Sequence, residues 1–588
     1  MTLQNTEIYK LRNNQANPDL MDRAQSIKWA IASRIRQYTA NVDIVCCCLA
    51  YLTSKCFFKY NNPMDLDLRK VIDDIEDKDI ANYIYDHVTP DILNAAKDIC
   101  LGASLDLLEM IPFLPDEYSG RYGEYSTPKT IGDLARELLG IKDNSKVADI
   151  CCGKGNFILD AYLDNQTNRY YGNDINTDCI YLAKIRFDLL EDNAKKSIVI
   201  KQENVFDDNT DNSFDRVFSN YPFGFRTRDN NQMLDFILQH GEFNLSESVS
   251  SEWVFNSLVK TKLNEKGKAV VIMPNGPLFK LGSDLNIRKQ FVENGYINSV
   301  IALPKNMYDY TAIPTTMLIL GNNKSNSIRF VDASNCYEKT RRLNVLSKAN
   351  ISEIVNALTN DSDISRDVSY DELADNDYNL TPQRYLNNVI DFKNGVEFGT
   401  VIKSITRGAG ISASELDKIS SVDKTNYQYV MLANIKGGII DSKLPYITEI
   451  PEKYERYCIK NNSLLLSKNG APYKVAVAKV EENTKILANG NLFVIEIDED
   501  KADPNYLKAF FNSQEGNKVL SSLSTNGTIP SISVNDLKKV SIPIPSLQKQ
   551  KEIAKDFLIV EDEIKVLEKK INKCREKLVG IFNTEEDA

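Results

Sequence analysis

The chain has 588 residues and a mass of 66.5 kDa. This is more than one hydrophobic core can organise, so about two to four domains are expected. Its 42% apolar and 26% charged residues are typical of a globular protein and exclude a disordered one. The formal net charge of −11 excludes a uniformly basic coat. A local DNA-facing surface remains compatible with it, because phosphate contacts depend on nearby cations.

Membrane, secretion and metal-binding patterns are not found. No apolar run reaches the roughly eighteen residues of a membrane span. The first residues do not start a basic segment followed by an apolar core, so we expect no secretory signal and a cytoplasmic location. Cysteines stand partly in adjacent groups, such as Cys46, Cys47 and Cys48. Adjacent cysteines cannot build a regular disulfide framework and no paired CxxC spacing offers a zinc site, so we expect reduced thiols and no metal.

Residues 1–116 are predicted to form an N-terminal helical domain. From about residue 22 onward, apolar residues recur three and four positions apart, which is the spacing of one helix face. The cysteines of this region are expected to face the helical core. Pro112, Pro115 and Gly120 then interrupt the pattern and mark its end.

Residues 117–335 alternate between strand-like and helix-like patterns, which predicts a doubly wound α/β sheet. Helices are expected near 130–139 and 180–190. A sheet of this kind binds its ligand in the crevice at the carboxyl ends of the strands. The predicted strands are 147–150, 169–173, 198–200, 214–218, 269–273, 297–303 and 316–320.

The rest of the chain divides into three segments. Residues 336–394 predict a mostly helical connection. Residues 395–547 predict a mixed-β domain, because short strand-like pieces alternate with Gly and Asn turns. Residues 548–588 predict one long helix, whose apolar stripe is typical of a coiled-coil seam; a helix packed on its own domain is the alternative. The stripe consists of Ile553, Phe557, Val560, Ile564, Leu567, Ile571, Cys574, Leu578 and Ile581.

A glycine loop follows the first predicted strand. Gly153 and Gly155 let the backbone approach a ligand closely, and the helix that follows favours a carboxylate at its amino end. Asp174, at the end of the next strand, is placed to hold ribose hydroxyls. Asn204 and Asp207, after the third strand, are placed at the adenine rim of the same ligand. Dinucleotide binding is the alternative, although the third glycine of that motif is missing.

A second loop, residues 220–224 (Asn-Tyr-Pro-Phe-Gly), follows the fourth predicted strand. The Asn220 carboxamide can accept hydrogen bonds from an exocyclic amine while Phe223 stacks on the ring that carries the amine. Methylation of an adenine amino group needs this combination. An ordinary turn is the alternative, since Pro222 and Gly224 are also typical turn residues.

In this order, the motifs resemble the methylation subunit of type I restriction-modification systems, a family of S-adenosylmethionine-dependent DNA adenine-N6 methyltransferases. The resemblance covers about residues 20–386. It implies a Rossmann-like methyltransferase fold with S-adenosylmethionine as cofactor. The matching segments are 124–129 (EYSTPK), 149–157 (DICCGKGNF), Asp174, 220–224 (NYPFG), 271–276 (VIMPNG), 287–289 (IRK), 300–304 (VIALP) and 313–316 (IPTT).

The resemblance also implies roles for single residues. The catalytic set is Asn220, Tyr221, Pro222 and Phe223, in which Asn220 and the carbonyl of the next residue accept from the target amine. The family usually has Pro where this chain has Tyr221, but a Tyr carbonyl serves equally well if Pro222 keeps the turn extended. The cofactor-binding set is Tyr125, Ser126, Thr127 and Pro128, then Asp149, Cys151, Cys152, Gly153 and Gly155, with Asp174 at the ribose and Asn204 at the adenine.

Residues 395–583 resemble one half of a type I specificity subunit, with a target-recognition domain followed by a long helix. The resemblance rests on 527–533 (GTIPSIS), Leu537 and 542–550 (IPIPSLQKQ). The expected partners are double-stranded DNA, a second copy paired antiparallel through the C-terminal helix, and a separate restriction subunit. Candidate DNA contacts are Lys436, Lys468, Tyr473 and Lys474.

The sequence therefore predicts a fused polypeptide that reads DNA, flips an adenine and methylates its N6 atom. Transfer depends mainly on positioning, so no strong general base is required and His87 and His240 are expected to be structural or surface residues. A combined restriction and modification enzyme is one alternative, although neither a nuclease carboxylate cluster nor a phosphate loop is found. A DNA-binding repressor on an inactive methylase scaffold is another, motivated by Tyr221.

Overall fold

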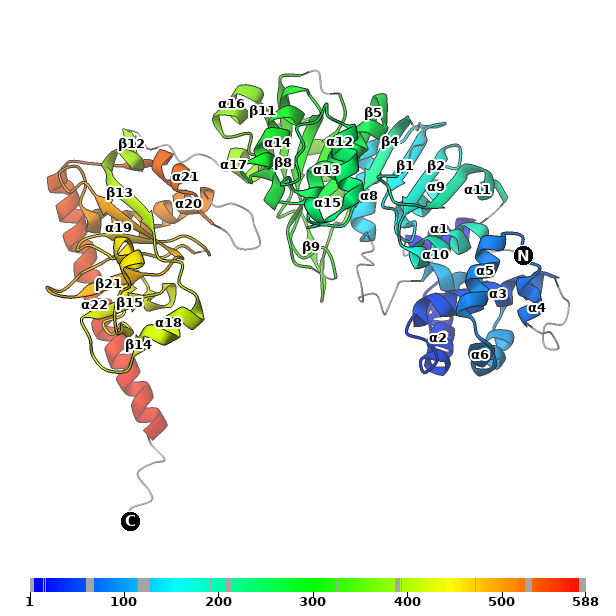
Figure 1. The fold of residues 1–588 in the computed structure, drawn as a ribbon, viewed down its shortest axis with the longest axis horizontal. Helices are drawn as coiled ribbons and strands as arrows, with labels where there is room; N and C mark the ends of the chain where they lie inside the picture. The colour runs from blue at the N-terminus through cyan, green and yellow to red at the C-terminus, as the bar shows by residue number, and fades with distance from the viewer. Residues whose placement is uncertain are drawn as a thin grey trace, which may run out of the picture. The chain divides into compact units, whose positions relative to one another are not determined.

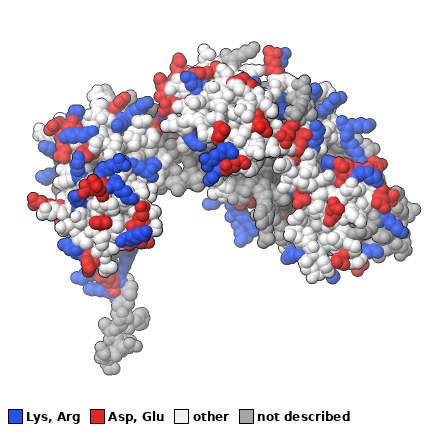
Figure 2. All heavy atoms as spheres, viewed as in Figure 1, with Lys and Arg blue, Asp and Glu red and all other residues white. Residues whose placement is uncertain are grey.

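The computed structural model forms two compact units, unit 1 (Met1–Pro382) and unit 2 (Gln383–Ala588), shown in Figure 1. None of the helices in the described part combines the length and apolar character that a membrane span requires. Lys and Arg are interspersed with Asp and Glu over the face seen in Figure 2. The structure describes the whole chain except residues 1–4, 14, 16, 60–67, 115–126, 191, 208–212, 310, 323–324, 387–391, 393, 471, 524–530 and 581–588.

Unit 1 begins with the predicted helices. Several start at a side-chain cap, since Asn17, Asp77 and Thr89 each accept hydrogen bonds from backbone N–H groups of the first turn. Their buried residues form one continuous apolar core with those of the helices beside the sheet. The helices are α1 Asn5–Arg12, α2 Pro18–Ile35, α3 Val42–Lys59, α4 Leu68–Ile72, α5 Lys78–His87, α6 Pro90–Gly102, α7 Leu105–Met110 and the 3-10 helix η2 Ile111–Phe113.

A nine-stranded sheet forms the centre of unit 1, in the order β11-β8-β6-β7-β5-β4-β1-β2-β3. Every strand predicted from the sequence is present. The chain builds outward from β1 in both directions, so the switch point, where ligands bind in such sheets, lies between β1 and β4. The strands are β1 Lys146–Ile150, β2 Arg169–Asp174, β3 Ile198–Gln202, β4 Phe214–Ser219, β5 Leu263–Pro274, β6 Ile297–Ala302, β7 Thr315–Leu320, β8 Ser327–Asp332 and β11 Ser365–Ser369.

Two strands at one edge were not predicted. β8 pairs parallel with β6, and β11 pairs antiparallel with β8. β11 falls within residues 336–394, which were assigned to a mostly helical connection, so this segment also completes the sheet. An edge strand is short and partly exposed, and Ser365–Ser369, in which only Ser365 and Val368 are buried, lacks the apolar run that marks a central strand.

Helices pack beside the sheet, and α8 (Lys129–Leu139) is an example. Ile131, Leu134 and Leu138 are buried on one face, and Gly140 ends the helix in the left-handed conformation. The remaining elements are α9 Asn156–Asp164, α10 Thr177–Asp188, α11 Asp192–Ser197, η3 Thr227–Asp229, α12 Asn231–Gln239, α13 Ser251–Lys262, η4 Gly276–Leu278, α14 Ser283–Glu293, β9 Glu338–Lys339, β10 Asn344–Val345, α15 Lys348–Ala357, α16 Tyr370–Asp375 and α17 Pro382–Leu386.

Unit 2 has the predicted mixed-β character, with four-stranded sheets β13-β22-β19-β20 and β14-β18-β15-β21. Both faces of β19 are buried, because Leu464 and Leu466 pack in one apolar cluster and Leu465 in another. The elements are β12 Gly395–Glu397, η5 Phe398–Val401, β13 Ile402–Arg407, α18 Ala413–Ile419, β14 Ser420–Ser421, β15 Tyr427–Val430, η6 Leu432–Asn434, β16 Ile435–Lys436, β17 Ile439–Ile440, β18 Tyr446–Ile447, η7 Glu452–Tyr457, β19 Leu464–Ser467, β20 Val475–Val477, β21 Lys485–Ala488, β22 Leu492–Ile497, α19 Pro504–Asn512, α20 Gln514–Ser522, α21 Val534–Lys539 and β23 Ser541–Pro543.

The predicted C-terminal helix is α22 (Leu547–Gly580). It packs on α19 of its own unit, where Ala554 is buried and Glu561 forms a buried ion pair with Lys508. The predicted apolar stripe behaves differently, because Leu567 and Ile571 are 56% and 51% exposed. One face of α22 thus packs within unit 2, whereas most of the stripe beyond the middle of the helix faces solvent in the single chain. Ile581, the last residue of the predicted stripe, lies outside the described residues.

Candidate active site

A cavity of about 810 Å³ lies at the carboxyl ends of β1, β2 and β4. The structure brings many of the predicted site residues together there, although they come from loops far apart in the sequence. The two predicted motifs therefore face one common space. The predicted residues in its wall are Cys151, Gly153, Asp174, Asn204, Asn220, Tyr221, Pro222 and Phe223.

The glycine loop is held by backbone geometry and by Arg186. Cys151, Gly153 and Gly155 all adopt positive φ angles, of 66°, 51° and 72°, so the chain turns tightly between β1 and α9. Arg186 donates from Nη1 to the Lys154 carbonyl at 3.0 Å and from Nε to a second backbone carbonyl. At Gly155 an added Cβ would stand 3.0 Å from the Phe187 ring. The loop therefore presents a fixed backbone to the cavity.

Two carboxyl groups lie near this loop. Asp174 accepts hydrogen bonds from the N–H groups of Gly153 and Asn176, both at 2.9 Å, and burial raises its pKa. Asp149 is almost fully buried, and burial holds its pKa well above the usual range. Asp174 lines the cavity, whereas Asp149 is buried and is not among the lining residues. Asp174 is therefore directly accessible to a ligand in the cavity, and the predicted cofactor role of Asp149 stays a prediction.

The Asn220 carboxamide has a defined orientation. Its Nδ2 donates to Oγ1 of Thr127 at 2.9 Å, and its Oδ1 accepts a long hydrogen bond of 3.4 Å from the Tyr308 hydroxyl. The amide nitrogen is thus engaged, and the oxygen, which has two lone pairs, keeps capacity for a further donor. Thr127 stands just before α8, so a residue predicted for the cofactor also contacts the predicted catalytic amide.

Tyr221 and Phe223 point to different surroundings. The Tyr221 ring is buried, stacks on Phe255 with centroids 4.6 Å apart, and donates its hydroxyl to Oδ1 of Asn256 at 2.8 Å. Phe223 is only partly buried and makes an edge-to-face contact with Tyr308. The Tyr that replaces the family's Pro is therefore anchored in the core.

Several predicted residues lie outside the cavity wall. Cys152 packs in the apolar core, and Gly155 is the residue immediately before α9. Pro128 is the residue before α8, and Asp207 is exposed. Tyr125 and Ser126 lie outside the described residues. Their predicted roles remain predictions.

The cavity also contains residues that the sequence reasoning missed. Phe206 and Phe255 contribute rings to its wall, and Thr311 and Ile313 reach it from the loop between β6 and β7. Ile313 belongs to the IPTT segment that supported the resemblance, and its place after a strand's carboxyl end was a usable signal. Outside this wall, Glu252 accepts a hydrogen bond from the Gly224 N–H at 2.9 Å, and burial raises its pKa.

The four residues of unit 2 that were predicted to contact DNA differ in their exposure and in their contacts. Tyr473 is buried in an apolar core, so the prediction that it faces DNA is wrong. The sequence alone does not distinguish a buried aromatic residue beside Lys474 from one in an exposed loop. Lys474 donates from Nζ to the Leu432 carbonyl at 2.9 Å and is held within the unit. Lys436 is exposed and pairs with Asp441 at 3.5 Å. Lys468 is half-buried, and burial lowers its pKa.

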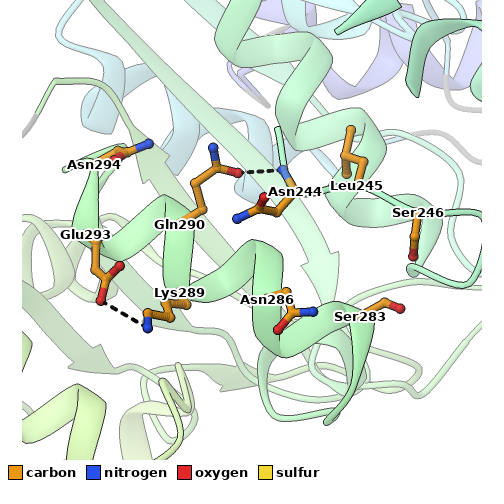
Figure 3. A pocket seen from close by; sticks show the side chains of 9 residues that line it. All are labelled: Asn244, Leu245, Ser246, Ser283, Asn286, Lys289, Gln290, Glu293 and Asn294. Atoms are coloured by element: carbon orange, nitrogen blue, oxygen red, sulfur yellow. Dashed lines mark hydrogen bonds and ion pairs between the residues drawn. The ribbon is translucent and has the colours of Figure 1, made fainter. Parts of the chain in front are cut away.

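A separate hollow of about 650 Å³ lies between the 244–246 loop and α14. Figure 3 shows its mainly polar lining, in which Oε1 of Gln290 accepts from the Asn244 backbone and Lys289 pairs with Glu293. None of the predicted site residues lies there. No group of three or more His, Cys, Asp or Glu side chains among the described residues could hold a metal ion.

Comparison of the sequence with known protein families gives two matches. Residues 111–391 match the N-6 DNA methylase family, and residues 414–575 match the type I restriction modification DNA specificity domain. The chain joins an N-6 DNA methylase domain to one type I specificity domain. The fusion expected from the sequence is thereby confirmed.

Proteins similar to this chain include type I methylase subunits. The chain is 28% identical over 289 residues to the type I restriction enzyme MpnII methylase subunit of Mycoplasma pneumoniae, covering 45% of this chain and 53% of that protein. It is 27% identical over 312 residues to the MjaVIII methylase subunit of Methanocaldococcus jannaschii, covering 48% and 53%. The chain thus spans about half the length of these relatives.

Among solved structures, the type IIG restriction endonuclease BpuSI is similar with a TM-score of 0.50 and 14% identity, covering 91% of this chain and 74% of that one. At this level of identity the likeness concerns the fold alone.

Proposed function

We propose that the chain is a sequence-specific DNA methyltransferase that transfers a methyl group from S-adenosylmethionine to N6 of an adenine. The observation that carries the proposal is the shared cavity, whose wall contains both Asp174 with the glycine loop and the segment from Asn220 to Phe223. A methyl donor and an amine acceptor need adjoining sites of this kind. The matches to a DNA methylase family and to a DNA specificity domain support the same activity.

The chemistry of the cavity wall fits the cofactor. Asp174 uses two acceptor positions on backbone N–H groups, and a carboxylate offers about four, so it can also accept from ribose hydroxyls. At Gly153, open space remains where a Cβ would stand. We assign the ribose to Asp174, the adenine edge to Asn204 and the methionine end to Thr127 and Pro128. S-adenosylmethionine, when bound, supplies an electrophilic methyl group.

Asn220 orients the amine that receives the methyl group. Because Nδ2 is engaged by Thr127, Oδ1 is the atom available to accept from the target amine, together with the backbone carbonyl of Tyr221. Phe223 stacks on the adenine ring. Two acceptors direct the amine lone pair toward the methyl group, so positioning supplies the catalysis. The adenine has to leave the duplex stack to reach this cavity.

We further propose that unit 2 reads the target sequence and that two chains pair antiparallel through the stripe of α22 as a coiled coil. The support is the exposed apolar stripe, because an isolated helix would leave Ile564, Leu567 and Ile571 in water.

A separate restriction subunit completes the system, and the N-terminal helices form a supporting domain of the methylase. The protein acts in the cytoplasm, where its DNA substrate lies.

Single-molecule sequencing of host DNA, with and without the gene, tests the activity. We expect N6-methyladenine in one motif to disappear on deletion, to return with the unaltered gene and to stay absent with Asn220→Ala. Asn244→Ala, an exposed Asn on the polar hollow, is the matched control and should restore methylation. Isothermal titration with S-adenosylmethionine, followed by a methyl-transfer assay, separates the alternatives, because a repressor on an inactive scaffold would show no binding or no methyl transfer.

A further inference from the structure

A third hollow adjoins the candidate active site. It measures about 820 Å³ and is lined by residues 224–228, 247–250, 276–277 and 279–280, together with Glu252. Phe225 belongs to its wall and also to the wall of the active-site cavity, and its ring is 50% exposed. The groove therefore starts where the catalytic loop ends, and a strand that delivers a base to Asn220 has to pass beside it.

The exposed charge of this groove is mainly positive. Arg226, Arg228 and Lys280 line it with exposed side chains, against one exposed carboxylate, Glu247. The other lining acid, Glu252, is buried and has a raised pKa. Three exposed cations to one exposed carboxylate is an unusual ratio in a chain whose net charge is −11. A local excess of cations of this kind attracts an anion.

The cations of the groove are only loosely paired within the protein. Arg228 stands 3.7 Å from its neighbour Asp229, both well exposed. Lys280 lies 4.0 Å from Asp284, whose two oxygens already accept from the backbone N–H and the hydroxyl of Ser250. The exposed Arg228–Asp229 pair contributes little to stability. Asp284 is buried, and Lys280 also donates from Nζ to Oγ of Ser250 at 3.3 Å. The Arg228 guanidinium can therefore turn to a phosphate at small cost, and the exposed Lys280 ammonium, which has three donors, can bind a phosphate in addition to these partners.

The backbone beneath these side chains is fixed. The Thr227 hydroxyl donates to the buried Val249 carbonyl at 2.8 Å, and Arg226 forms a β-bridge with Ser250. The Gly224 N–H is bound by Glu252. The segment that carries the two arginines is thus a rigid continuation of the catalytic loop, so phosphates held by it would have a set position relative to Asn220.

We propose that this groove binds the sugar-phosphate backbone of the DNA strand that carries the target adenine, with Arg226, Arg228 and Lys280 as its phosphate-binding residues. The inference rests on the proposed function and extends it to the path of the substrate strand. Phosphate contacts beside the flipped nucleotide fix the register of the strand without reading sequence. In this arrangement unit 2 recognises the DNA sequence, and the groove fixes the position of the target strand relative to Asn220.

The test uses the full chain carrying R226A, R228A and K280A together, with the duplex motif identified by sequencing as probe. Fluorescence anisotropy at several salt concentrations gives the slope of log Kd against log salt. Each lost phosphate contact should reduce the magnitude of this slope by about 0.9, so we expect a reduction of about two to three. Affinity for S-adenosylmethionine, measured by titration calorimetry, should stay the same, and methyl transfer should fall.

The matched control removes three exposed cations near the amino ends of β1, β2 and β5, on the opposite edge of the sheet: K146A, R169A and K266A. It should keep the slope and the rate of the unaltered chain. R226K with R228K should restore most of the slope, which a merely structural role of the arginines would not predict. An unchanged slope in the groove variant, with normal methylation by the unaltered chain, would overturn the groove alone. No DNA methylation or binding by the unaltered chain would overturn the proposed function as well.

Discussion

Thr127 holds the amide on which the proposed chemistry depends. Without its hydroxyl, Nδ2 of Asn220 loses the acceptor at 2.9 Å and the carboxamide can rotate away from the orientation that offers Oδ1 to the amine. We expect Thr127→Val, which keeps the shape of the side chain, to lower kcat by about tenfold, or ~1.4 kcal/mol. Thr127→Ser keeps a hydroxyl and should retain most of the rate. Steady-state kinetics decide, because a residue that only bound the cofactor would raise KM and leave kcat unchanged.

Tyr221 is expected to matter for stability more than for rate. Its hydroxyl satisfies the buried Oδ1 of Asn256, and Tyr221→Phe leaves this oxygen without that donor. The cost should be about 1–3 kcal/mol, measured by urea unfolding, while kcat changes little because the proposed acceptor is the backbone carbonyl. Tyr38→Phe, at an exposed tyrosine, is the control and should be neutral. A large loss of kcat at unchanged stability would place the hydroxyl in the chemistry instead.

Sequence order revealed the candidate residues, but not their contacts. Asn220 and Asp174 could be named because each follows a strand, and strand ends in a parallel sheet meet at one edge. The bond from Asn220 to Thr127 joins residues 93 positions apart and leaves no local pattern. Tyr308 reaches Asn220 in the same way. The burial of single side chains could not be predicted from the sequence either, which is why Tyr473 was predicted to contact DNA.

Among the elements, apolar run length decided which strands could be predicted. Residues 269–273 of β5 and the whole of β7 are buried and contain a continuous apolar run, whereas Ser365–Ser369 buries only Ser365 and Val368 and resembles a polar connection. The antiparallel direction of β7 between β5 and β6 follows from pairing, not from its own sequence. Element type could therefore be predicted where the strand sequence was continuously apolar. β8 was missed although it is buried, because the charged Arg329 interrupts its apolar residues, and the topology could not be predicted from single strands.

The turn between β1 and α9 gives a prediction at this scale. Gly155 has φ of 72°, and a Cβ would meet Phe187 at 3.0 Å, so Gly155→Ala adds both strain and overlap. We expect it to destabilise the protein by more than about 1 kcal/mol and to weaken S-adenosylmethionine binding. Gly132→Ala, in the middle of α8 with its nearest neighbour 4.0 Å away, should stabilise by about 0.5–1 kcal/mol. Thermal unfolding and titration calorimetry check both, and equal effects would contradict the argument.

At the scale of the whole molecule, long-range polar contacts join segments that the sequence separates. The Tyr51 hydroxyl donates to Asp188 at 2.7 Å, and Arg12 pairs with Asp160 at 2.8 Å, so helices of the first hundred residues hold α10 and α9 beside the sheet. The Pro and Gly residues near 116 predicted a boundary, and that boundary stays a prediction. Buried apolar residues on both sides of this position belong to one continuous core.

The stripe of α22 predicts the architecture of the active protein. Leu567→Glu together with Ile571→Glu places two charges on the proposed seam, where they would repel their counterparts in a second chain, so we expect light scattering with cognate DNA to change from two copies to one. Val566→Glu is the matched control, because Val566 is 52% exposed but lies off the stripe. With antiparallel pairing, two recognition units read a symmetric pair of half-sites, so the seam variant should methylate its full motif more slowly at low protein concentration. A variant that remained dimeric would show that α22 is not the seam.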